Sequence, residues 1–472
     1  MRKRLVLGCF LLLSLPIAAK IVFPTVMADN MVLQQNEQVN LWGKASPNAT
    51  VNVVPAWDHK TYTTVADKAG KWIVKVQTPS AGGPYDIAFS DGEKVTLKNI
   101  LIGEVWFCSG QSNMQMPVKG FGGQPVAGST DYIVKARKTT PIRMYTTVNK
   151  ISKTPMDDIE GSWKEHTSEG VATCSATAYF FAKYLQEVLD VPVGLVISNW
   201  GGSNVEAWMS REAMIPFKEF DLSYLDNDRK SGRPDNQTPC YLYNAKLHPL
   251  INYTVRGTIW YQGEANTGDP DLYTRLFPAF VQDLRKSFSQ GEMPFYYVQI
   301  APYSYGKPDE TGAAKLRESQ LKCMDLIPNC GMAVTMDVGD RYTIHPKQKK
   351  EIGDRLAYWA LAKTYHLSEI PYESPVYDSM TVKEGKAILR FKTSTGLSPI
   401  GKNLEGFEVA GADKVFHKAK AYVNAWEKTV EVSCDEVEEP VAVRYAFKNY
   451  AAATLFNDYD IPVSSFRTDN WE

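Results

Sequence analysis

The sequence predicts an α/β protein in which a three-layer domain with a mostly parallel sheet is flanked by β-sandwich-like modules at both ends. Between residues 99 and 367, apolar strand-like runs alternate with helical patterns, which is typical of a parallel sheet covered by helices on both faces. Residues 21–98 and 374–472 instead contain short runs typical of strands, separated in the first segment by turns rich in Gly, Pro, Asn and Asp.

Length and composition are those of a globular protein with several domains. The chain has 472 residues, of which 44% are hydrophobic and 22% are charged, so it can bury sizeable cores. Lys and Arg number 52 against 53 Asp and Glu, and this balance provides no basic field. We therefore expect no nucleic acid among its partners.

The first residues have the pattern of a secretory signal peptide. Basic residues at 2–4 precede an apolar run over 5–17, and small residues suited to cleavage follow near Ala19. We predict a signal peptide at 1–19 and a secreted or periplasmic mature protein. A membrane anchor is the alternative, but this run is short for a bilayer, and no other run predicts a membrane span.

The two outer modules are expected to consist of short strands. In the N-terminal module (21–98), runs typical of strands cover 39–43, 50–57, 71–77 and 85–90, and turn signals lie at 45–49, 67–71 and 80–84. In the C-terminal module (374–472), the expected strands include 386–392, 405–411, 429–434 and 441–447.

The central region, 99–367, is expected to form the α/β domain. Its expected strands cover 100–108, 191–199, 255–261, 294–300 and 331–338, and helical patterns cover 176–189, 271–288 and 313–326. A last helix is expected to begin at Pro346, because proline suits the first turn of a helix. Its apolar face would carry Ile352, Leu356, Trp359 and Ala360.

Four polar clusters each directly follow an expected strand of the central region. In an open parallel sheet, ligands bind beyond the carboxyl ends of the strands, so a series of such clusters predicts the rim of an active site. The clusters contain Ser, paired Gly, Asn and His, and they cover 109–113, 200–208, 262–266 and 339–346.

Ser112 in the first cluster and His345 in the last are the candidate nucleophile and base, because a Ser hydroxyl attacks well only when a base takes its proton. The backbone N–H of Ser112, the N–H of Gly202 and the side-chain amide of Asn266 are candidate donors to an oxyanion. The paired glycines at 201–202 let the backbone approach a ligand. For each residue taken alone, a turn serine, a structural histidine or an ordinary glycine turn is the alternative.

Other features of these segments have ordinary explanations. Glu206, Glu264 and Asp337 can form buried ion pairs or helix caps. The run GFGG at 120–123 resembles a phosphate loop only superficially, because no strand directly precedes it. Residues 110–114 lack the second glycine of the G-x-S-x-G nucleophile elbow, so an α/β-hydrolase is not the natural interpretation.

The clusters resemble the sequence blocks of the SGNH hydrolases, and specifically those of the sialate O-acetylesterase-like family. The blocks are GQSNM (110–114), GGSNVEAW (201–208), WYQGEAN (260–266) and IHP (344–346). Further segments extend the resemblance over most of the mature chain: DNMVLQ (29–34), AGGPYDI (81–87), LYNAKLHPL (242–250) and FRTD (466–469). The resemblance implies a flavodoxin-like three-layer SGNH-hydrolase domain with Ser112 as nucleophile and His345 as base. It also implies oxyanion and substrate-binding residues within the same blocks: Gly202, Asn266, Gln262, Glu264 and Gln111.

The sequence departs from the family pattern at the acid that orients the catalytic histidine. SGNH hydrolases often carry Asp three residues before this histidine, and here the position holds Tyr342. Asp340 is our first candidate for the orienting acid, and Asp337 is the second. A Ser–His dyad supported by a backbone carbonyl is the third possibility.

The cysteines and the motifs indicate neither a metal nor another cofactor. Of seven Cys, Cys9 lies in the predicted signal peptide, and the spread of the others gives no metal-ligand spacing and no disulfide framework. Cys323 and Cys330 can pair in an oxidising compartment, and buried free thiols are the alternative.

Together these observations predict a carbohydrate O-acetylesterase that acts through an acyl-Ser112 intermediate, with no cofactor. The expected partner is an O-acetylated small molecule or glycan, most simply O-acetylated sialic acid. An acetylated hemicellulose is the alternative substrate. A carbohydrate-binding protein on the same scaffold and an acetyl transferase are the alternatives of other classes.

Overall fold

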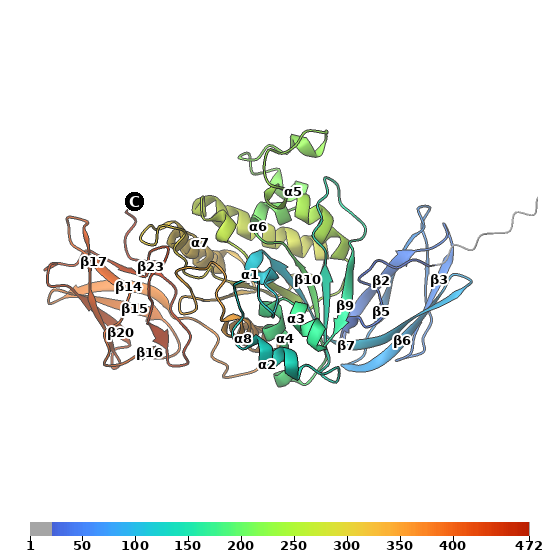
Figure 1. Cartoon of the computed structure of the whole chain (residues 1–472), viewed down its shortest axis with the longest axis horizontal. Helices are drawn as coiled ribbons and strands as arrows, with labels where there is room; N and C mark the ends of the chain where they lie inside the picture. Colours follow the sequence, from blue (N-terminus) through green and yellow to red (C-terminus); the bar gives the residue numbers. More distant parts are fainter. Residues whose placement is uncertain (1–20, 472) are drawn as a thin grey trace, which may run out of the picture.

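The computed structural model describes residues 21–471, so the predicted signal peptide at 1–19 lies outside the described residues. The N-terminal β module, the central α/β domain and the C-terminal β module follow one another along the long axis of the molecule (Figure 1). Within residues 21–471, no helix has both the length and the apolar character needed to cross a membrane.

The central sheet has the strand order β13-β12-β11-β7-β10-β8-β9. Its strands are β7 (Lys94–Gly110), β8 (Ile142–Thr147), β9 (Gly161–Glu165), β10 (Val193–Asn199), β11 (Gly257–Tyr261), β12 (Phe295–Val298) and β13 (Cys330–Ala333). Neighbouring strands are parallel, except for the antiparallel pair of β8 with the edge strand β9. The prediction of an α/β fold with a mostly parallel sheet is confirmed. The strands β8 and β9 were not predicted, because their runs IRMYTT and GSWKE contain too many polar residues to stand out as strands.

The order of the inner strands determines where a ligand can bind. Without β8 and β9, the strands numbered in chain order lie as 2-1-3-4-5, which is the order of flavodoxin-like doubly wound sheets. The first strand, β7, lies between β10 and β11. Ligands of such sheets bind beyond the carboxyl ends of the strands where the order reverses, which here means beyond β7 and its neighbours.

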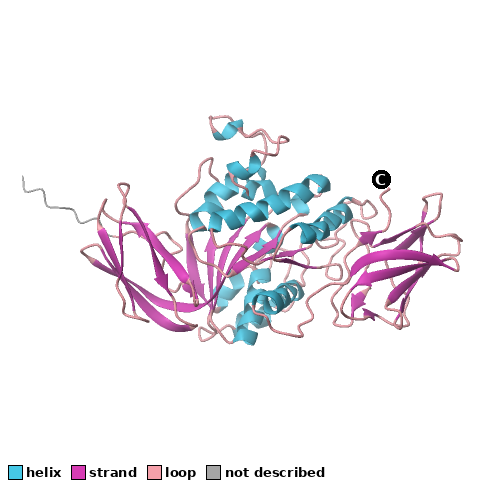
Figure 2. Cartoon of the chain, turned by 180° about the vertical axis from the view of Figure 1, so that it is seen from behind, coloured by secondary structure: helices cyan, strands magenta, loops and turns pink. Residues whose placement is uncertain are grey.

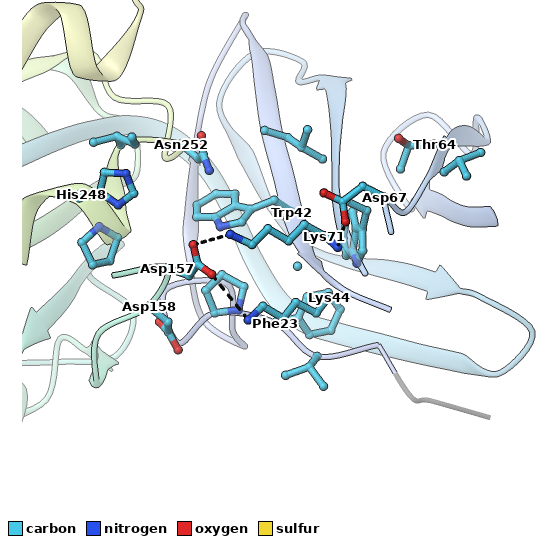
Figure 3. Close-up of a pocket in the computed structure, with 18 residues that line it drawn as sticks. Phe23, Trp42, Lys44, Thr64, Asp67, Lys71, Asp157, Asp158, His248 and Asn252 are labelled. Atoms are coloured by element: carbon cyan, nitrogen blue, oxygen red, sulfur yellow. Dashed lines mark hydrogen bonds and ion pairs between the residues drawn. The ribbon is translucent and has the colours of Figure 1, made fainter. Parts of the chain in front are cut away.

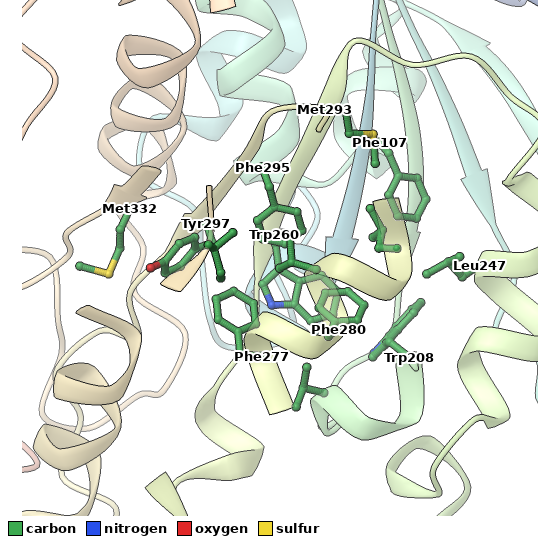
Figure 4. Packing of buried hydrophobic residues seen from close by; sticks show 14 of the residues in the cluster. Phe107, Trp208, Leu247, Trp260, Phe277, Phe280, Met293, Phe295, Tyr297 and Met332 are labelled. Atoms are coloured by element: carbon green, nitrogen blue, oxygen red, sulfur yellow. The ribbon is translucent and has the colours of Figure 1, made fainter. Parts of the chain in front are cut away.

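Helices cover both faces of the sheet (Figure 2). One face carries α4 (Ala176–Leu189) and α8 (Lys349–Trp359), and the other carries α6 (Pro270–Phe288) and α7 (Gly312–Leu326). Residues of β11 point alternately to the two faces, as the pleat of a strand requires. Ile259 and Tyr261 join the core beneath α4 and α8, whereas Trp260 packs against Phe280 of α6 with 4.5 Å between ring centroids (Figure 4).

The helices follow the predicted boundaries closely, with one exception. Helix α4 has the expected limits, and α6 and α7 each begin one residue earlier than expected. The last helix begins at Lys349 instead of Pro346, and a π-helical turn, η7 (Ala360–Thr364), continues it. The difference arises because the carbonyl of Lys347 accepts a hydrogen bond from the N–H of Ala127, 2.9 Å away, which holds the preceding residues in a loop.

The N-terminal module shares a strand with the central domain. Its strands are β1 (Val32–Gln34), β2 (Gln38–Lys44), β3 (Thr50–Pro55), β4 (Tyr62–Val65), β5 (Lys71–Gln77) and β6 (Gly82–Ser90). β2 and β5 form a separate sheet, while β1 and β6 pair with the first part of β7. β7 thus passes through residues 98 and 99 without a break, from the module into the central sheet.

The C-terminal module is built of antiparallel sheets. Its strands are β14 (Val376–Lys383), β15 (Lys386–Lys392), β16 (Leu397–Ser398), β17 (Phe407–Ala410), β18 (Phe416–Lys418), β19 (Lys420–Asn424), β20 (Thr429–Ser433), β21 (Ala442–Tyr445), β22 (Phe456–Asn457) and β23 (Phe466–Arg467). The two larger sheets have the orders β14-β15-β20-β19 and β18-β17-β21-β23.

Short helices lie in the loops of the central domain. They are α1 (Ser112–Gln115), α2 (Ser129–Lys135), α3 (Ser168–Thr173), α5 (Arg211–Met214), η1 (Val205–Trp208), η2 (Ser223–Leu225), η3 (Asp235–Gln237), η4 (Tyr243–Leu247), η5 (His248–Leu250) and η6 (Glu264–Asn266). Three of them, α1, η1 and η6, follow the carboxyl ends of central strands or the turns after these ends. Helix α1 carries Ser112, η6 carries Glu264 and Asn266, and η1 follows the turn that contains Gly202.

The six cysteines of the described residues are free thiols, so Cys323 and Cys330 are unpaired in the structure. Burial raises the pKa of the Cys323 thiol to about 12 and that of Cys330 to about 11. Thiols with such pKa values stay protonated at neutral pH and are poor nucleophiles.

Candidate active site

Three of the four polar clusters meet because their strands end at the same level. Gly110 at the end of β7 lies opposite both Asn199 at the end of β10 and Tyr261 at the end of β11. The residues that follow therefore leave the sheet side by side. The fourth cluster follows β13, which is separated from β7 by two strands, and the loop 334–348 brings His345 back toward them.

The turn after β7 places Ser112 at the start of helix α1. Gly110 has a φ of +142°, and a Cβ atom there would lie 2.1 Å from the carbonyl oxygen of Tyr261, so only glycine fits. The next residue, Gln111, donates its backbone N–H to the same carbonyl at 2.9 Å. Ser112 is the first residue of α1, so its N–H has no acceptor within the helix and is free for a ligand.

The glycine turn after β10 packs directly against Ser112. A Cβ atom on Gly201 would lie 3.3 Å from Cβ of Ser112 and 2.9 Å from Oε1 of Gln115, so a side chain would crowd the serine. Gln115 Oε1 accepts the N–H of Gly201 at 2.7 Å. This leaves the N–H of Gly202 as the next donor of the turn, and the carbonyls of both glycines are held by the side chains of Asn236 and Gln237.

His345 is tied to the serine helix through neighbouring residues. Asn113, which follows Ser112, donates from Nδ2 to the carbonyl of Ile344, which precedes His345, at 3.0 Å. The Nε2 atom of His345 is buried and has no hydrogen-bond partner among the described residues. The site thus contains an imidazole nitrogen with an unused hydrogen-bonding position, on a loop that is hydrogen-bonded through Ile344 to Asn113, the residue after Ser112.

The other imidazole nitrogen has a close partner. Nδ1 of His345 lies 2.6 Å from Oε1 of Gln124, and the ring of Phe121 packs edge-on against the imidazole at 5.3 Å. Both residues belong to the segment 120–125 that contains the GFGG run, which therefore forms part of the site as a brace for the histidine.

A buried polar cluster lies beneath these residues. Asn113 donates to Oε1 of Glu264 at 2.6 Å and accepts a hydrogen bond from Nζ of Lys349 at 2.5 Å. Both charged residues are removed from solvent, with Lys349 0% and Glu264 7% exposed. The amide of Asn113 therefore bridges a carboxylate and an amine, and fixes their positions relative to α1.

Burial dominates the acid–base properties of this cluster. It raises the pKa of Glu264 and lowers the pKa of Lys349 to about 7. The pKa of His345 is lowered to about 4, mainly by burial and to a smaller extent by the charge of Lys349. His345 is therefore neutral at pH 7, which is the form that can accept a proton.

Asn266 is held in a defined orientation by its neighbours. Its Oδ1 accepts the N–H of Val205 at 3.1 Å and Nε2 of Gln262 at 2.6 Å, so its amide nitrogen points the other way, where it donates to Oε2 of Glu206 at 3.0 Å. The amide group carries a second N–H that these bonds leave free. Oε1 of Glu206 accepts from Arg233 at 3.1 Å, and the side chain of Arg233 is 44% exposed.

Two of the predicted substrate-binding residues hold the loops together. Gln111 is buried, and its Oε1 accepts the N–H groups of Gly263 at 3.1 Å and Ala265 at 3.3 Å. Gln262 is fully buried, and it donates to Asn266 and to the carbonyl of Ser203. Both polar atoms of the Gln262 side chain are thus used by protein groups, whereas Gln111 joins the loops through its oxygen.

The structure gives the two aspartates proposed as orienting acids other partners. Oδ1 of Asp340 accepts the backbone N–H groups of Tyr342 at 2.7 Å and Thr343 at 3.1 Å. Asp337 forms a bidentate ion pair with Arg355, with both N–O distances at 2.7 Å. The hydrogen bonds of Asp340 shape its own loop, and the ion pair of Asp337 attaches this loop to α8. The group that contacts Nδ1 of His345 is the amide of Gln124 and not a carboxylate.

Two hollows of the described residues lie away from this site. One, of about 610 Å³, lies between the N-terminal module and the central domain, where Asp157 pairs with Lys71 and Lys44 (Figure 3). Another, of about 800 Å³, is also lined by residues of both parts. Neither is lined by Ser112 or His345. Among residues 21–471, no group of three or more His, Cys, Asp or Glu side chains is placed to hold a metal ion.

Sequence reasoning missed Gln124 and Lys349. Gln124 gave no signal, because it lies in a glycine-rich loop that follows no strand. Lys349 gave a weak signal in the sequence. It precedes Ile352 by three residues and Leu356 by seven, so it lies on the apolar face of its helix. A lysine at such a position is an unusual choice for a buried face.

Comparison with known proteins assigns the family. Residues 102–362 match the family described as carbohydrate esterase, sialic acid-specific acetylesterase. The sialate O-acetylesterase of Homo sapiens is 29% identical over 427 residues, covering 82% of this chain and 79% of that protein, and that of Mus musculus is 27% identical over 491 residues, covering 91% and 90%. The crystal structure of a carbohydrate acetylesterase from Xanthomonas citri is 34% identical with a TM-score of 0.85, and covers 96% of this chain and 100% of that one.

These matches define the protein as a carboxylic ester hydrolase. The chain belongs to the carbohydrate esterase, sialic acid-specific acetylesterase family, whose profile covers more than half of it.

Proposed function

We propose that this hydrolase removes acetyl groups from sugars through an acyl-enzyme formed on Ser112, within an SGNH-hydrolase domain that spans residues 99–367. The observation that carries the mechanism is the buried Nε2 of His345, which has no hydrogen-bond partner among the described residues. It lies on a loop that is hydrogen-bonded to Asn113, the residue after Ser112. A neutral imidazole with one unused nitrogen is the group that can take the proton of a serine hydroxyl.

The proposed reaction proceeds in two halves. In the first, Oγ of Ser112 attacks the acetyl carbonyl while Nε2 of His345 takes its proton, and the imidazolium then protonates the departing sugar oxygen. In the second, His345 takes a proton from water as the water oxygen attacks the acyl carbonyl, and the imidazolium then returns this proton to Oγ of Ser112 as acetate leaves. The N–H groups of Ser112 and Gly202 and the free amide N–H of Asn266 would stabilise the oxyanion in each half.

The proposed substrate is O-acetylated sialic acid. The family description and the names of the mammalian relatives support this choice. The partly exposed guanidinium of Arg233 adds a structural reason, because it is joined to Asn266 through Glu206 and can pair with the carboxylate of an acidic sugar. An acetylated hemicellulose oligosaccharide is the second candidate, since the solved relative from Xanthomonas citri is described only as a carbohydrate acetylesterase.

The test is the release of acetate by the purified protein and by its Ser112→Ala variant. We expect acetate from O-acetylated sialic acid, and a fall in kcat of roughly 10⁴-fold or more in the variant, as when a member of a catalytic triad is removed. The Ser112→Ala variant should keep the wild-type melting temperature, because it loses a single oxygen atom. An active variant would refute the role of Ser112.

The same assay separates the other functions. Release of acetate from acetylated xylan oligosaccharides, but not from acetylated sialic acid, would assign the second substrate. Transfer of the acetyl group to an added sugar in place of water would indicate a transferase. Binding of sugars without any release of acetate would indicate a carbohydrate-binding protein.

A further inference from the structure

The imidazole of His345 must be held in one tautomer for the proposed reaction. Nε2 can accept the serine proton only if the ring hydrogen resides on Nδ1, and the partner of Nδ1 determines whether it does. That partner is Oε1 of Gln124, at 2.6 Å. An amide oxygen is only an acceptor, so this contact requires a hydrogen on Nδ1 and leaves the lone pair of Nε2 free.

The loop that carries Gln124 is anchored on both sides of the residue. Gln124 and Phe121 exchange backbone hydrogen bonds, each of 3.0 Å, which close the turn at the GFGG run. Beyond it, the N–H of Ala127 donates to the carbonyl of Lys347 at 2.9 Å, two residues after His345. The amide and the imidazole are therefore parts of one connected unit, and Phe121 supports the ring from a second direction.

Within residues 21–471, no carboxylate is hydrogen-bonded to the imidazole of His345. Oδ1 of Asp340 is used by the backbone of its own loop, and Asp337 is paired with Arg355. From α8, the charge of Lys349 disfavours the imidazolium, and Asn113 joins Lys349 to Glu264.

We propose that Gln124 is the positioning residue of His345, and that it takes with a neutral amide the place that an aspartate holds in a Ser–His–Asp triad. The proposal rests on the proposed Ser112–His345 mechanism. A neutral partner fixes the tautomer and the direction of the ring, but adds no negative charge to stabilise the imidazolium. The histidine is therefore kept as a weak base that stays unprotonated in acid.

Two substitutions of Gln124 test this role, with hydrolysis of a chromogenic acetate ester measured across pH. Gln124→Leu removes the acceptor, and we expect kcat to fall on the order of 10²-fold, within the range typical of general-base contributions, with little change in melting temperature. Gln124→Glu restores an acceptor and adds a charge. It should recover activity relative to Gln124→Leu and move the acid limb of the pH profile upward by about one unit or more.

A merely structural role for Gln124 makes different predictions. Both variants would then lose activity in parallel with melting temperature, and the acid limb would stay where it is in the wild type. The matched control is Asp340→Asn, which we expect to leave the acid limb unchanged. Normal kcat in Gln124→Leu, or an unmoved acid limb in a folded Gln124→Glu, would overturn the proposal.

A measurement without turnover separates this proposal from the proposed function. In protein labelled with ¹⁵N-histidine, NMR of the imidazole nitrogens identifies the tautomer, and a His345→Ala variant assigns the signals. We expect the Nδ1–H tautomer in the wild type and its loss in Gln124→Leu. An Nε2–H tautomer in the wild type would refute the positioning role even if the enzyme is active. An Nδ1–H tautomer that depends on Gln124 would uphold it even if acetate is not the product released.

Discussion

Replacing Lys349 by Met should move the acid limb of the pH–rate profile to higher pH. His345 must be neutral to act as a base, so activity falls with decreasing pH as the imidazole is protonated. Burial and the charge of Lys349 lower its pKa to about 4, from an ordinary value of 6.5. The wild-type limb should therefore lie near pH 4, and activity should persist in mild acid.

The size of the shift follows from the order of the two causes. Burial is the larger cause, so removing the charge of Lys349 should raise the pKa of His345 only part of the way back to its ordinary value. The new limb should therefore lie between about 4 and 6.5. Lys349 itself has a pKa of about 7, so it is charged throughout the range in which the limb lies. Lys349 is thus positively charged at the pH values at which the protonation of His345 is measured.

The assay is kcat/KM for a chromogenic acetate ester, measured from about pH 3.5 to about pH 9 at constant ionic strength. Glu264→Gln is the matched control, because it alters the same buried cluster but keeps the lysine, and it should not raise the limb. Melting temperatures at both ends of the range would establish that each variant is folded. A wild-type limb near 6.5, or identical limbs in the wild type and a folded Lys349→Met, would refute the reasoning.

Three further substitutions test the surroundings of the site and the attachment of the C-terminal module. Gly201→Ala should lower kcat/KM at least ~10-fold with the fold retained, because its Cβ would lie 3.3 Å from Cβ of Ser112; normal kinetics would contradict this packing. Arg233→Gln should raise KM for acetylated sialic acid and spare acetylated neutral sugars; an equal effect on both would argue against pairing with a carboxylate. Arg317→Leu should destabilise the protein by about 2–5 kcal/mol in urea unfolding, because this buried arginine donates to Ser465 at 3.0 Å and to the carbonyl of Lys448 in the C-terminal module; an unchanged midpoint would refute its role.

The sheet and the strand-end clusters could be predicted because their signals are local. Apolar runs such as GTIWY mark a buried strand, and polar residues directly after it must lie at the edge of the sheet. Ser112 and the glycine turn 201–202 meet as expected, since β7 and β10 are adjacent and end at the same level. The strands β8 and β9 at one end of the sheet were not predicted, because the polar residues in their runs hide the strand pattern.

The partner of His345 could not be predicted, because the contact with Gln124 joins residues 221 positions apart. Asp340 was favoured for its closeness in sequence, but a carboxylate in a loop competes for the N–H groups two and three residues ahead, and here it binds both. Closeness along the chain thus favoured a bond within the loop over one with the imidazole.

The strand β7 also determines how the molecule can come apart. It is 17 residues long, which corresponds to roughly 56 Å of extended chain. Its pairing with β1 ends at Gly103, and its pairing with β10 begins at Glu104. Glu104 is buried at this junction, where it accepts hydrogen bonds from Gln35 of the N-terminal module and from Arg256 and Tyr365 of the central domain.

Because β7 is continuous, local unfolding of the strands on one side of it should also disrupt the sheet on the other side. Hydrogen exchange should therefore report the N-terminal module and the strands around Ser112 as a single cooperative unit, with amides on both halves of β7 exchanging at similar rates. Truncation before β7 would leave its first half without partners and expose a long unpaired edge, which promotes aggregation. The N-terminal module is in this sense the first part of the scaffold that holds the serine turn, and an engineered minimal esterase would have to retain it.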